Sequence, residues 1–101
     1  MAPAPLVLAQ SSDWRARAVD LEKTDPGAAR AVLMRASQSL PQEPEAQLRY
    51  AEFLDRYGDP AARAEYRKLT GPVRSETVLR RLVLLDLIAG DRASADSDLA
   101  L

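Results

Sequence analysis

Apolar residues recur along most of the chain with the spacing of one face of an α-helix, three and four residues apart. Trp14, Ala18 and Leu21 mark the first such face. Clusters of proline, glycine and aspartate interrupt the pattern, and such clusters end one helix and begin the next. No long stretch alternates apolar and polar residues as a half-buried strand would, so we expect only helices: five complete ones and a partial sixth from about Arg92. The later apolar faces contain Ala29, Val32, Leu33, Ala36 and Leu40; Ala46, Tyr50, Ala51, Phe53, Leu54 and Tyr57; Ala61, Ala62, Ala64, Tyr66 and Leu69; and Val78, Leu79, Leu82, Val83, Leu85 and Ala89.

Residues 1–11 differ from the rest of the chain, because they contain helix breakers and show no amphipathic period. Val7, Leu8 and Ala9 before Gln10 resemble the small-residue end of an export signal, although no basic residue precedes them. We therefore expect a disordered leader or the remnant of an export signal, with the first helix capped by Ser12. Two compartments stay open: the cytoplasm, or the periplasm or cell exterior if residues 1–9 end such a signal.

Short turn sequences return at a nearly constant spacing. The dipeptide Asp-Pro occurs at positions 25–26 and again at 59–60, Ala-Ala-Arg-Ala occurs at 28–31 and again at 61–64, and Gly-Asp occurs at 58–59 and again at 90–91. A period of about 34 residues with two helices in each unit resembles the tetratricopeptide repeat. This resemblance implies an all-α fold in which antiparallel helical hairpins stack as a short right-handed α-solenoid. It covers residues 12–101, with units at about 12–43, 44–74 and 75–101, the last incomplete.

The sizes of residues along the helices fit this resemblance. In the second helix the family's order of small, large, small and proline is met by Ala29, Leu33, Ala36 and Pro41. The family's slots for Trp, Leu, Gly and Tyr hold Gln47, Tyr50, Ala51 and Leu54 in the third helix. Trp14 occupies the Trp slot of the first unit, where the family uses it for core packing; stacking on a ligand is the alternative.

Two residues depart from the family pattern. Arg63 stands where the family has a small alanine, and Asp86 stands in a large apolar slot. A buried carboxylate requires a charged partner, so we expect Asp86 to pair with Arg67 or Arg63, or else to face solvent. A related kind of helical-hairpin repeat remains an alternative to the tetratricopeptide repeat.

Composition narrows the possible functions. The chain of 101 residues has no Cys and no His, which removes thiol nucleophiles, Cys/His zinc sites and Ser-His-Asp triads. The formal charge of -1 provides no excess of cations for nucleic acid, and no apolar run is long enough to span a membrane. The carboxylate pairs Asp55/Asp59 and Asp96/Asp98 lie beside turns or arginines, where capping and solvation explain them. We expect no enzyme, no metal and no cofactor.

The resemblance implies a concave groove lined by the first helix of each unit, which would bind a protein or peptide. Some family members hold a peptide carboxylate there with a Lys/Asn/Arg clamp, but Leu48 and Glu52 occupy two of those slots. A basic cluster of Arg74, Arg80 and Arg81 and another of Arg63, Arg67 and Lys68 either bind an anionic group or pair with neighbours such as Glu76 and Glu65. The groove residues implied by the resemblance are Arg15, Val19, Lys23, Leu48, Glu52, Asp55, Arg56, Arg80, Leu84 and Leu87.

Two functional hypotheses follow, and groove chemistry separates them. A binding module should expose apolar side chains or unpaired charges, whereas a structural spacer or capping segment of a larger protein should pair its charges internally. Leu84, Leu87 and Ile88 lie away from the inner side of the fifth helix, and the sixth is too short to cover them. We therefore expect either a fragment of a longer repeat protein, with rapid amide exchange after Gly90 and a tendency to self-associate, or an apolar C-terminal face that binds a second copy of the chain or a partner helix.

Overall fold

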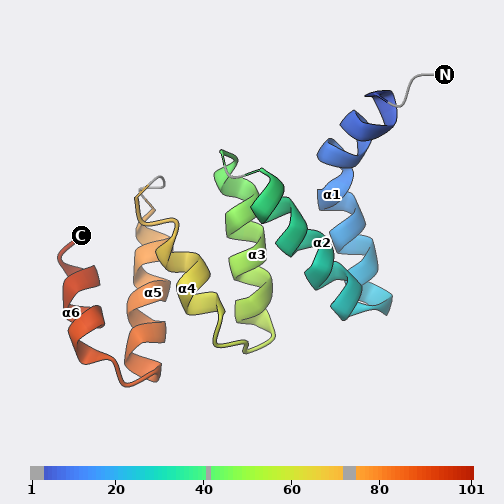
Figure 1. Cartoon of the computed structure of the whole chain (residues 1–101). Coiled ribbons are helices and arrows are strands. Elements are labelled where there is room, and N and C mark those ends of the chain that lie inside the picture. Colours follow the sequence, from blue (N-terminus) through green and yellow to red (C-terminus); the bar gives the residue numbers. More distant parts are fainter. Residues whose placement is uncertain (1–3, 41, 72–74) are drawn as a thin grey trace.

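The computed structural model describes residues 4–40, 42–71 and 75–101, and every regular element in these ranges is an α-helix (Figure 1). The elements are α1 (Ala4–Thr24), α2 (Pro26–Ser39), α3 (Pro44–Arg56), α4 (Ala62–Arg67), α5 (Glu76–Ile88) and α6 (Arg92–Leu99). The predictions of an all-α fold and of a sixth helix from Arg92 are confirmed for this part of the chain, although α4 is shorter than α6. Arg74 and Pro41 lie outside the described residues.

The predicted start of α1 is wrong. We expected the helix to begin after Ser12, but α1 begins at Ala4 and runs through the segment interpreted as a leader. Pro5 falls in the first turn, where proline is tolerated because its missing N–H has no helical partner. The residues from Leu6 to Gln10 are mostly good helix formers, so the helix extends upstream of the cap that the sequence suggested.

Side-chain caps begin the helices α2, α5 and α6. Asp25 accepts a hydrogen bond from the Ala28 amide at 3.2 Å, and Ser75 accepts one from the Val78 amide at 3.3 Å. Asp91 does the same for the Ser94 amide at 3.0 Å. These caps satisfy amides that have no partner within the helix.

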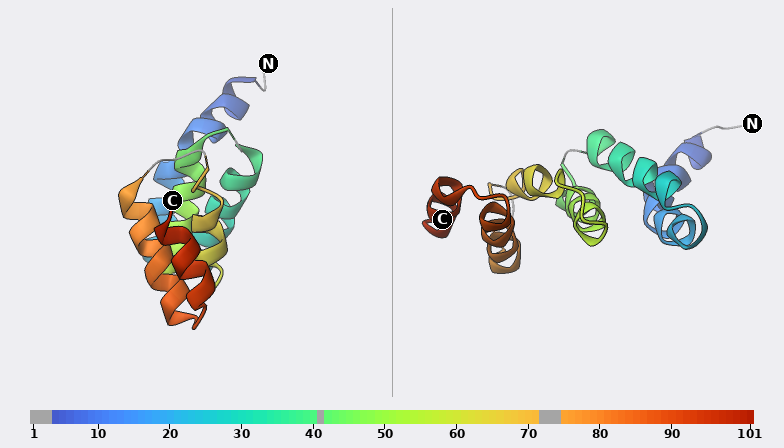
Figure 2. Two further views of the ribbon diagram at one scale, coloured as in Figure 1. Left: turned by 90° about the vertical axis from the view of Figure 1, so that its left-hand side faces the viewer. Right: turned by 90° about the horizontal axis from the view of Figure 1, so that it is seen from below.

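Successive helices run in alternating directions and pack on one another in chain order (Figure 1). Seen along the helices, α1, α3 and α5 form one row and α2, α4 and α6 form a second row (Figure 2). The molecule measures 55 × 28 × 16 Å, and its radius of gyration of 15.3 Å exceeds the ~13 Å of a compact domain of this length. The chain is therefore an elongated two-layer array.

The core lies between the two rows of helices. Ala29 and Ala51 are completely buried and Trp14 is nearly so, as predicted. Small residues at these places let neighbouring helices approach closely, which is why the alanines carry no exposed surface. The core side chains are Trp14, Ala18, Ala29, Val32, Leu33, Ala36, Ala46, Tyr50, Ala51, Phe53, Leu54, Ala62, Tyr66, Leu69, Val78 and Leu82.

Some residues of the predicted apolar faces are exposed instead. Tyr57 follows the last turn of α3, and Ala89 follows the last turn of α5. Ala61 precedes α4, and Ala64 lies on the exposed side of that helix. Each of these residues lies at a helix end or on the short helix α4. The apolar spacing identifies a buried face only where a neighbouring helix covers that face, and the ends of helices are covered least.

Candidate interaction surfaces

The predicted groove residues all lie on the row formed by α1, α3 and α5. Charged residues of this row join neighbouring helices to one another. Arg15 of α1 donates to Glu45 of α3, and Arg56 of α3 donates to Glu22 of α1 at 2.9 Å. The row is therefore bridged by ion pairs at both ends of the α1/α3 contact.

Asp55 makes the corresponding bridge between α3 and α5. The guanidinium of Arg81 donates to both of its carboxylate oxygens at 2.6 Å, and the Tyr66 hydroxyl donates to Oδ2 at 3.0 Å. The Arg81 hydrogen bonds lower the pKa of Asp55 in spite of burial, and burial together with the Asp55 carboxylate raises the pKa of Tyr66. Asp55 therefore belongs to a joint between helices and is not a free ligand.

Other charged groove residues pair within their own helix. Lys23 lies 3.7 Å from Asp20, and Arg80 lies 3.6 Å from Glu76, so the predicted pairing of Arg80 is confirmed. These pairs are solvent-exposed, and such pairs contribute little to stability.

The uncharged groove positions differ in exposure. Leu48 is partly buried against the core and Val19 is exposed. Leu84 and Leu87 are 44% and 51% exposed, and the neighbouring Ile88 is 70% exposed. These three residues at i, i+3 and i+4 share one face of α5 and are named here the α5 apolar stripe.

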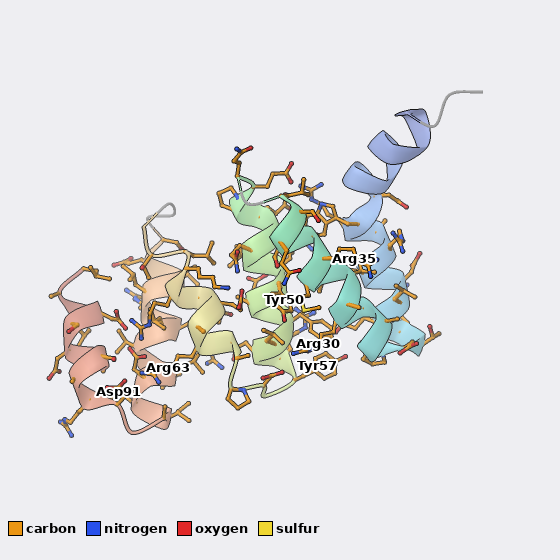
Figure 3. The ribbon with its side chains drawn as sticks, in the orientation of Figure 1. Arg30, Arg35, Tyr50, Tyr57, Arg63 and Asp91 are labelled. Atoms are coloured by element: carbon orange, nitrogen blue, oxygen red, sulfur yellow. The ribbon has the colours of Figure 1, made fainter. Side chains whose placement is uncertain are left out.

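A buried ionic cluster joins α4, α5 and α6. Asp86 is completely buried and accepts from Arg63 Nε at 2.6 Å and from Arg67 Nη2 at 2.9 Å. Arg67 Nη1 also donates to Asp98, at 3.0 Å from Oδ1 and 3.1 Å from Oδ2. Arg63 and Asp91 point toward each other across the α4–α6 side and form an ion pair (Figure 3). The prediction that Asp86 pairs with these arginines is confirmed.

This pairing explains both departures from the repeat pattern, because Arg63 and Asp86 are partners. Asp98 was not predicted to join this cluster: its position in the sequence suggested a capping or solvated role, but the side chain is buried against Arg67. Glu22, Tyr66 and Arg81 were also missed as groove partners. The opposite charges of Glu22 and Arg56, which lie 34 residues apart in the sequence, were the available signal.

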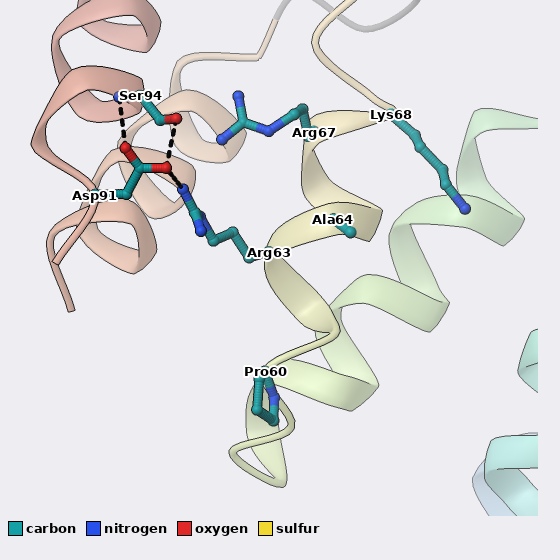
Figure 4. Close-up of a pocket in the computed structure, with 7 residues that line it drawn as sticks. All are labelled: Pro60, Arg63, Ala64, Arg67, Lys68, Asp91 and Ser94. Carbon is teal, nitrogen blue, oxygen red and sulfur yellow. Dashed lines mark hydrogen bonds and ion pairs between the residues drawn. The ribbon is translucent and has the colours of Figure 1, made fainter. Parts of the chain in front are cut away.

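A hollow of about 500 Å³ opens beside this cluster (Figure 4). Its charged lining is already paired: Arg63 with Asp91, Arg67 with the buried carboxylates, and Lys68 with Glu65 at 3.0 Å. An anion would have to displace an internal carboxylate to bind here. A smaller hollow of about 320 Å³ lies between the start of α2 and the end of α3, lined by Pro26, Gly27, Arg30, Phe53, Leu54, Tyr57 and Asp59.

The carboxylate pairs singled out from the sequence have structural roles. Asp59 accepts from the Ala61 amide at 2.9 Å and lies near Arg30, while Asp55 is held by Arg81. Asp98 is buried on Arg67, whereas Asp96 is exposed. Among the described residues, no three His, Cys, Asp or Glu side chains gather as a metal site would require, and no helix is long and apolar enough to cross a membrane.

Comparison with known proteins yields no relative, because no protein-family model, curated protein or solved structure matches the chain.

Proposed function

We propose that this chain is a tetratricopeptide-like helical repeat scaffold that binds an amphipathic helix of a partner protein along the α5 apolar stripe. The observation that carries the proposal is the exposure of Leu84, Leu87 and Ile88 side by side on one helix face. Adjoining exposed apolar side chains of this kind are typical of protein-binding surfaces.

The recurrence of local structure supports a repeat. Each second helix of a hairpin begins beside an aspartate whose side chain accepts from a backbone amide, and each buries an alanine in its first turns. The aspartates are Asp25, Asp59 and Asp91, and the alanines are Ala29, Ala62 and Ala95. Together with the two rows of helices, this pattern supports a right-handed stack of hairpins in units of about 12–43, 44–74 and 75–101.

The α5 apolar stripe occupies repeat-equivalent positions to residues that join neighbouring units. When the two Gly-Asp turns are aligned, residues 52, 55 and 56 of α3 correspond to residues 84, 87 and 88 of α5. When Trp14 and Gln47, which occupy the same slot of the proposed repeat, are aligned, residues 19, 22 and 23 of α1 correspond to residues 52, 55 and 56. In α1 and α3, an acid at this place reaches an arginine of the next helix in the row: Glu22 reaches Arg56, and Asp55 reaches Arg81. In α5 the equivalent residue is Leu87.

The nature of the partner follows from this continuity. α3 contacts Glu22 of α1, and α5 contacts Asp55 of α3. A partner helix placed in the same way beside α5 would contact Leu87 instead of an acid. It would need aliphatic side chains at i, i+3 and i+4 to cover the stripe, which is the helix-in-groove mode of recognition.

The test is selection of displayed helical peptides on the full chain, followed by titration of the enriched peptides. We expect peptides with an aliphatic stripe whose affinity falls at least tenfold for Leu87→Gln and is unchanged for Thr77→Gln, an exposed control on the same helix. Failure to enrich such peptides, or equal binding by both variants, would refute a helix-binding stripe.

A structural spacer or capping segment is the second candidate, favoured by the internal pairing of the groove charges. Arg15, Lys23, Asp55, Arg56 and Arg80 all have partners within the chain. A spacer would bind no selected peptide, and neutralising Asp55, whose pair with Arg81 joins α3 to α5, would alter its stability without altering any affinity.

A further inference from the structure

The cluster between α4, α5 and α6 holds more carboxyl groups than guanidinium groups. Asp86 of α5, Asp91 of the α5–α6 turn and Asp98 of α6 face Arg63 and Arg67 of α4. Asp86 is completely buried and Asp98 is 4% exposed, so water screens neither charge well. Among the residues that the structure describes, three carboxyl groups of this cluster therefore face two guanidinium groups.

The hydrogen bonds show where the imbalance lies. Asp86 Oδ1 accepts from both arginines, whereas Asp86 Oδ2 is buried with no donor from the part of the chain that the structure describes. The same Arg67 guanidinium donates to Asp86 and to the buried Asp98, so it holds the two carboxyl groups next to each other. Two ionised carboxylates in this arrangement repel each other, but a carboxyl–carboxylate pair that shares one proton does not.

We propose that Asp98 carries this proton and donates it to Asp86 Oδ2, so that α6 is docked most firmly at mildly acidic pH and loosens as the pH rises. The proton supplies the missing donor and brings the cluster to two ionised carboxylates against two guanidiniums. Loss of the proton leaves α6 held by the Arg67–Asp98 pair, by Asp91 and by the burial of Ala95. This proposal does not depend on the proposed binding of a partner helix, because none of the cluster residues belongs to the α5 apolar stripe.

The directions of the pKa shifts agree with this assignment. Burial and the neighbouring Asp86 carboxylate raise the pKa of Asp98 above its ordinary value. Burial alone would raise the pKa of Asp86 too, but hydrogen bonds from Asp98 and Arg63 outweigh it and lower that pKa. The Ser94 hydroxyl, the Ser94 amide and Arg63 lower the pKa of Asp91.

The signs define a pH window. A raised folded-state pKa at Asp98 gives stability that is complete below its unfolded pKa of about 3.9 and is lost as the pH rises through its folded pKa. The lowered pKa values of Asp86 and Asp91 give stability that is present above about 3.9 and is lost as the pH falls through their folded pKa values. All three contributions coexist only between the ordinary carboxyl pKa and the raised pKa of Asp98.

The coupling between proton binding and the docking of α6 gives the size of the pH effect. Within this window the docked helix holds a proton that the undocked helix has released, so the opening constant of α6 should rise up to about tenfold per pH unit. It should level off once the pH exceeds the folded-state pKa of Asp98.

The chain is suited to a direct test, because it contains no His or Cys and so has no side chain that ordinarily titrates between about pH 5 and 8. Residue-resolved carboxyl ¹³C titration of the full chain should show Asp98 titrating above the ordinary range and above Asp96, the exposed carboxylate of the same helix. Amide exchange in α6, corrected for the intrinsic pH dependence, should show the opening constant rising over the same interval.

Asp98→Asn provides the variant arm, since its amide can donate to Asp86 at every pH. Its α6 opening constant should be flat with pH, whereas Asp96→Asn should behave as the unaltered chain. If Asp98→Asn fails to dock α6, the ¹³C titration of the unaltered chain decides alone. An Asp98 that titrates at or below the ordinary carboxyl pKa would overturn the proposal.

Discussion

Asp55→Asn tests whether the ionic joint between α3 and α5 holds the two hairpins together. The substitution keeps the shape of the side chain but removes the charge that accepts two Arg81 hydrogen bonds at 2.6 Å and one from Tyr66 at 3.0 Å. An asparagine oxygen can still accept one of these bonds. Its NH₂ group, however, must face a guanidinium N–H, and two hydrogen-bond donors cannot bond to each other.

The magnitude follows from the exposure of the partner. A hydrogen bond to a charged group contributes about 1.5–3 kcal/mol, but the Arg81 side chain is 41% exposed and water screens the pair. We therefore expect the free energy of unfolding to fall by ~2 kcal/mol near neutral pH, less than the simple sum of the bonds. For a chain of this size that loss lowers the midpoint of thermal unfolding by about 8–16 °C.

The pH dependence provides the second half of the test. The Arg81 hydrogen bonds lower the pKa of Asp55, so its contribution is present above the unfolded carboxyl pKa of about 3.9 and is lost as the pH falls through the folded-state pKa. Thermal unfolding followed by circular dichroism should therefore show the gap between Asp55→Asn and the unaltered chain closing below about pH 4.

Glu52→Gln is the matched control, because Glu52 lies one turn earlier on the same helix and forms no ion pair with any described residue. Its free energy of unfolding should stay within about 0.5 kcal/mol of that of the unaltered chain. Equal effects of the two substitutions, or a gap for Asp55→Asn that persists in acid, would refute the reasoning.

Three further predictions concern the scaffold. Ala51→Leu should destabilise the chain by ~1–3 kcal/mol, since Ala51 is fully buried at a helix contact, whereas Ala64→Leu at an exposed position should leave urea unfolding unchanged. Ser75→Ala should cost ~1 kcal/mol by removing the cap on the Val78 amide, which thermal melts can measure. Gly58→Ala should cost about 1–2 kcal/mol in the same melts, because Gly58 has a φ of 68° even though open space surrounds it.

Helices were predictable from the sequence wherever a periodic apolar face coincided with a capping residue or a turn cluster. Asp25, Ser75 and Asp91 cap the helices that follow them, and capping is a local interaction that depends on only a few neighbouring residues. The start of α1 was not predictable in this way. Ser12 has the chemistry of an N-cap but lies within a run of helix formers, and continuing a helix is easier than starting one.

The ionic joints were only partly predictable, because their partners lie far apart in sequence. The need of Asp86 for an arginine follows from burial alone, and the helix that supplies the partner follows from the order of the hairpins. The Asp55–Arg81 bridge required knowing which faces of α3 and α5 meet. The exposure of Leu84, Leu87 and Ile88 was predictable, because α5 has apolar residues on two sides and the short helix α6 can cover only one of them.

α1 and α3 carry an acid that pairs with an arginine of the next helix in their row, whereas α5 carries exposed apolar side chains. The first kind of surface is suited to aligning neighbouring helices and the second to binding a partner. Where an acid on one helix meets an arginine on the next, as in Glu22–Arg56 and Asp55–Arg81, only one alignment of the two helices satisfies both charges. Charge complementarity of this kind fixes how adjacent hairpins align, in addition to the stability that each pair contributes. Apolar side chains bind more strongly for their area but tolerate several alignments. In the proposed repeat, Leu87 stands where α1 and α3 carry Glu22 and Asp55, and this difference is the physical reason for proposing that a partner helix binds there.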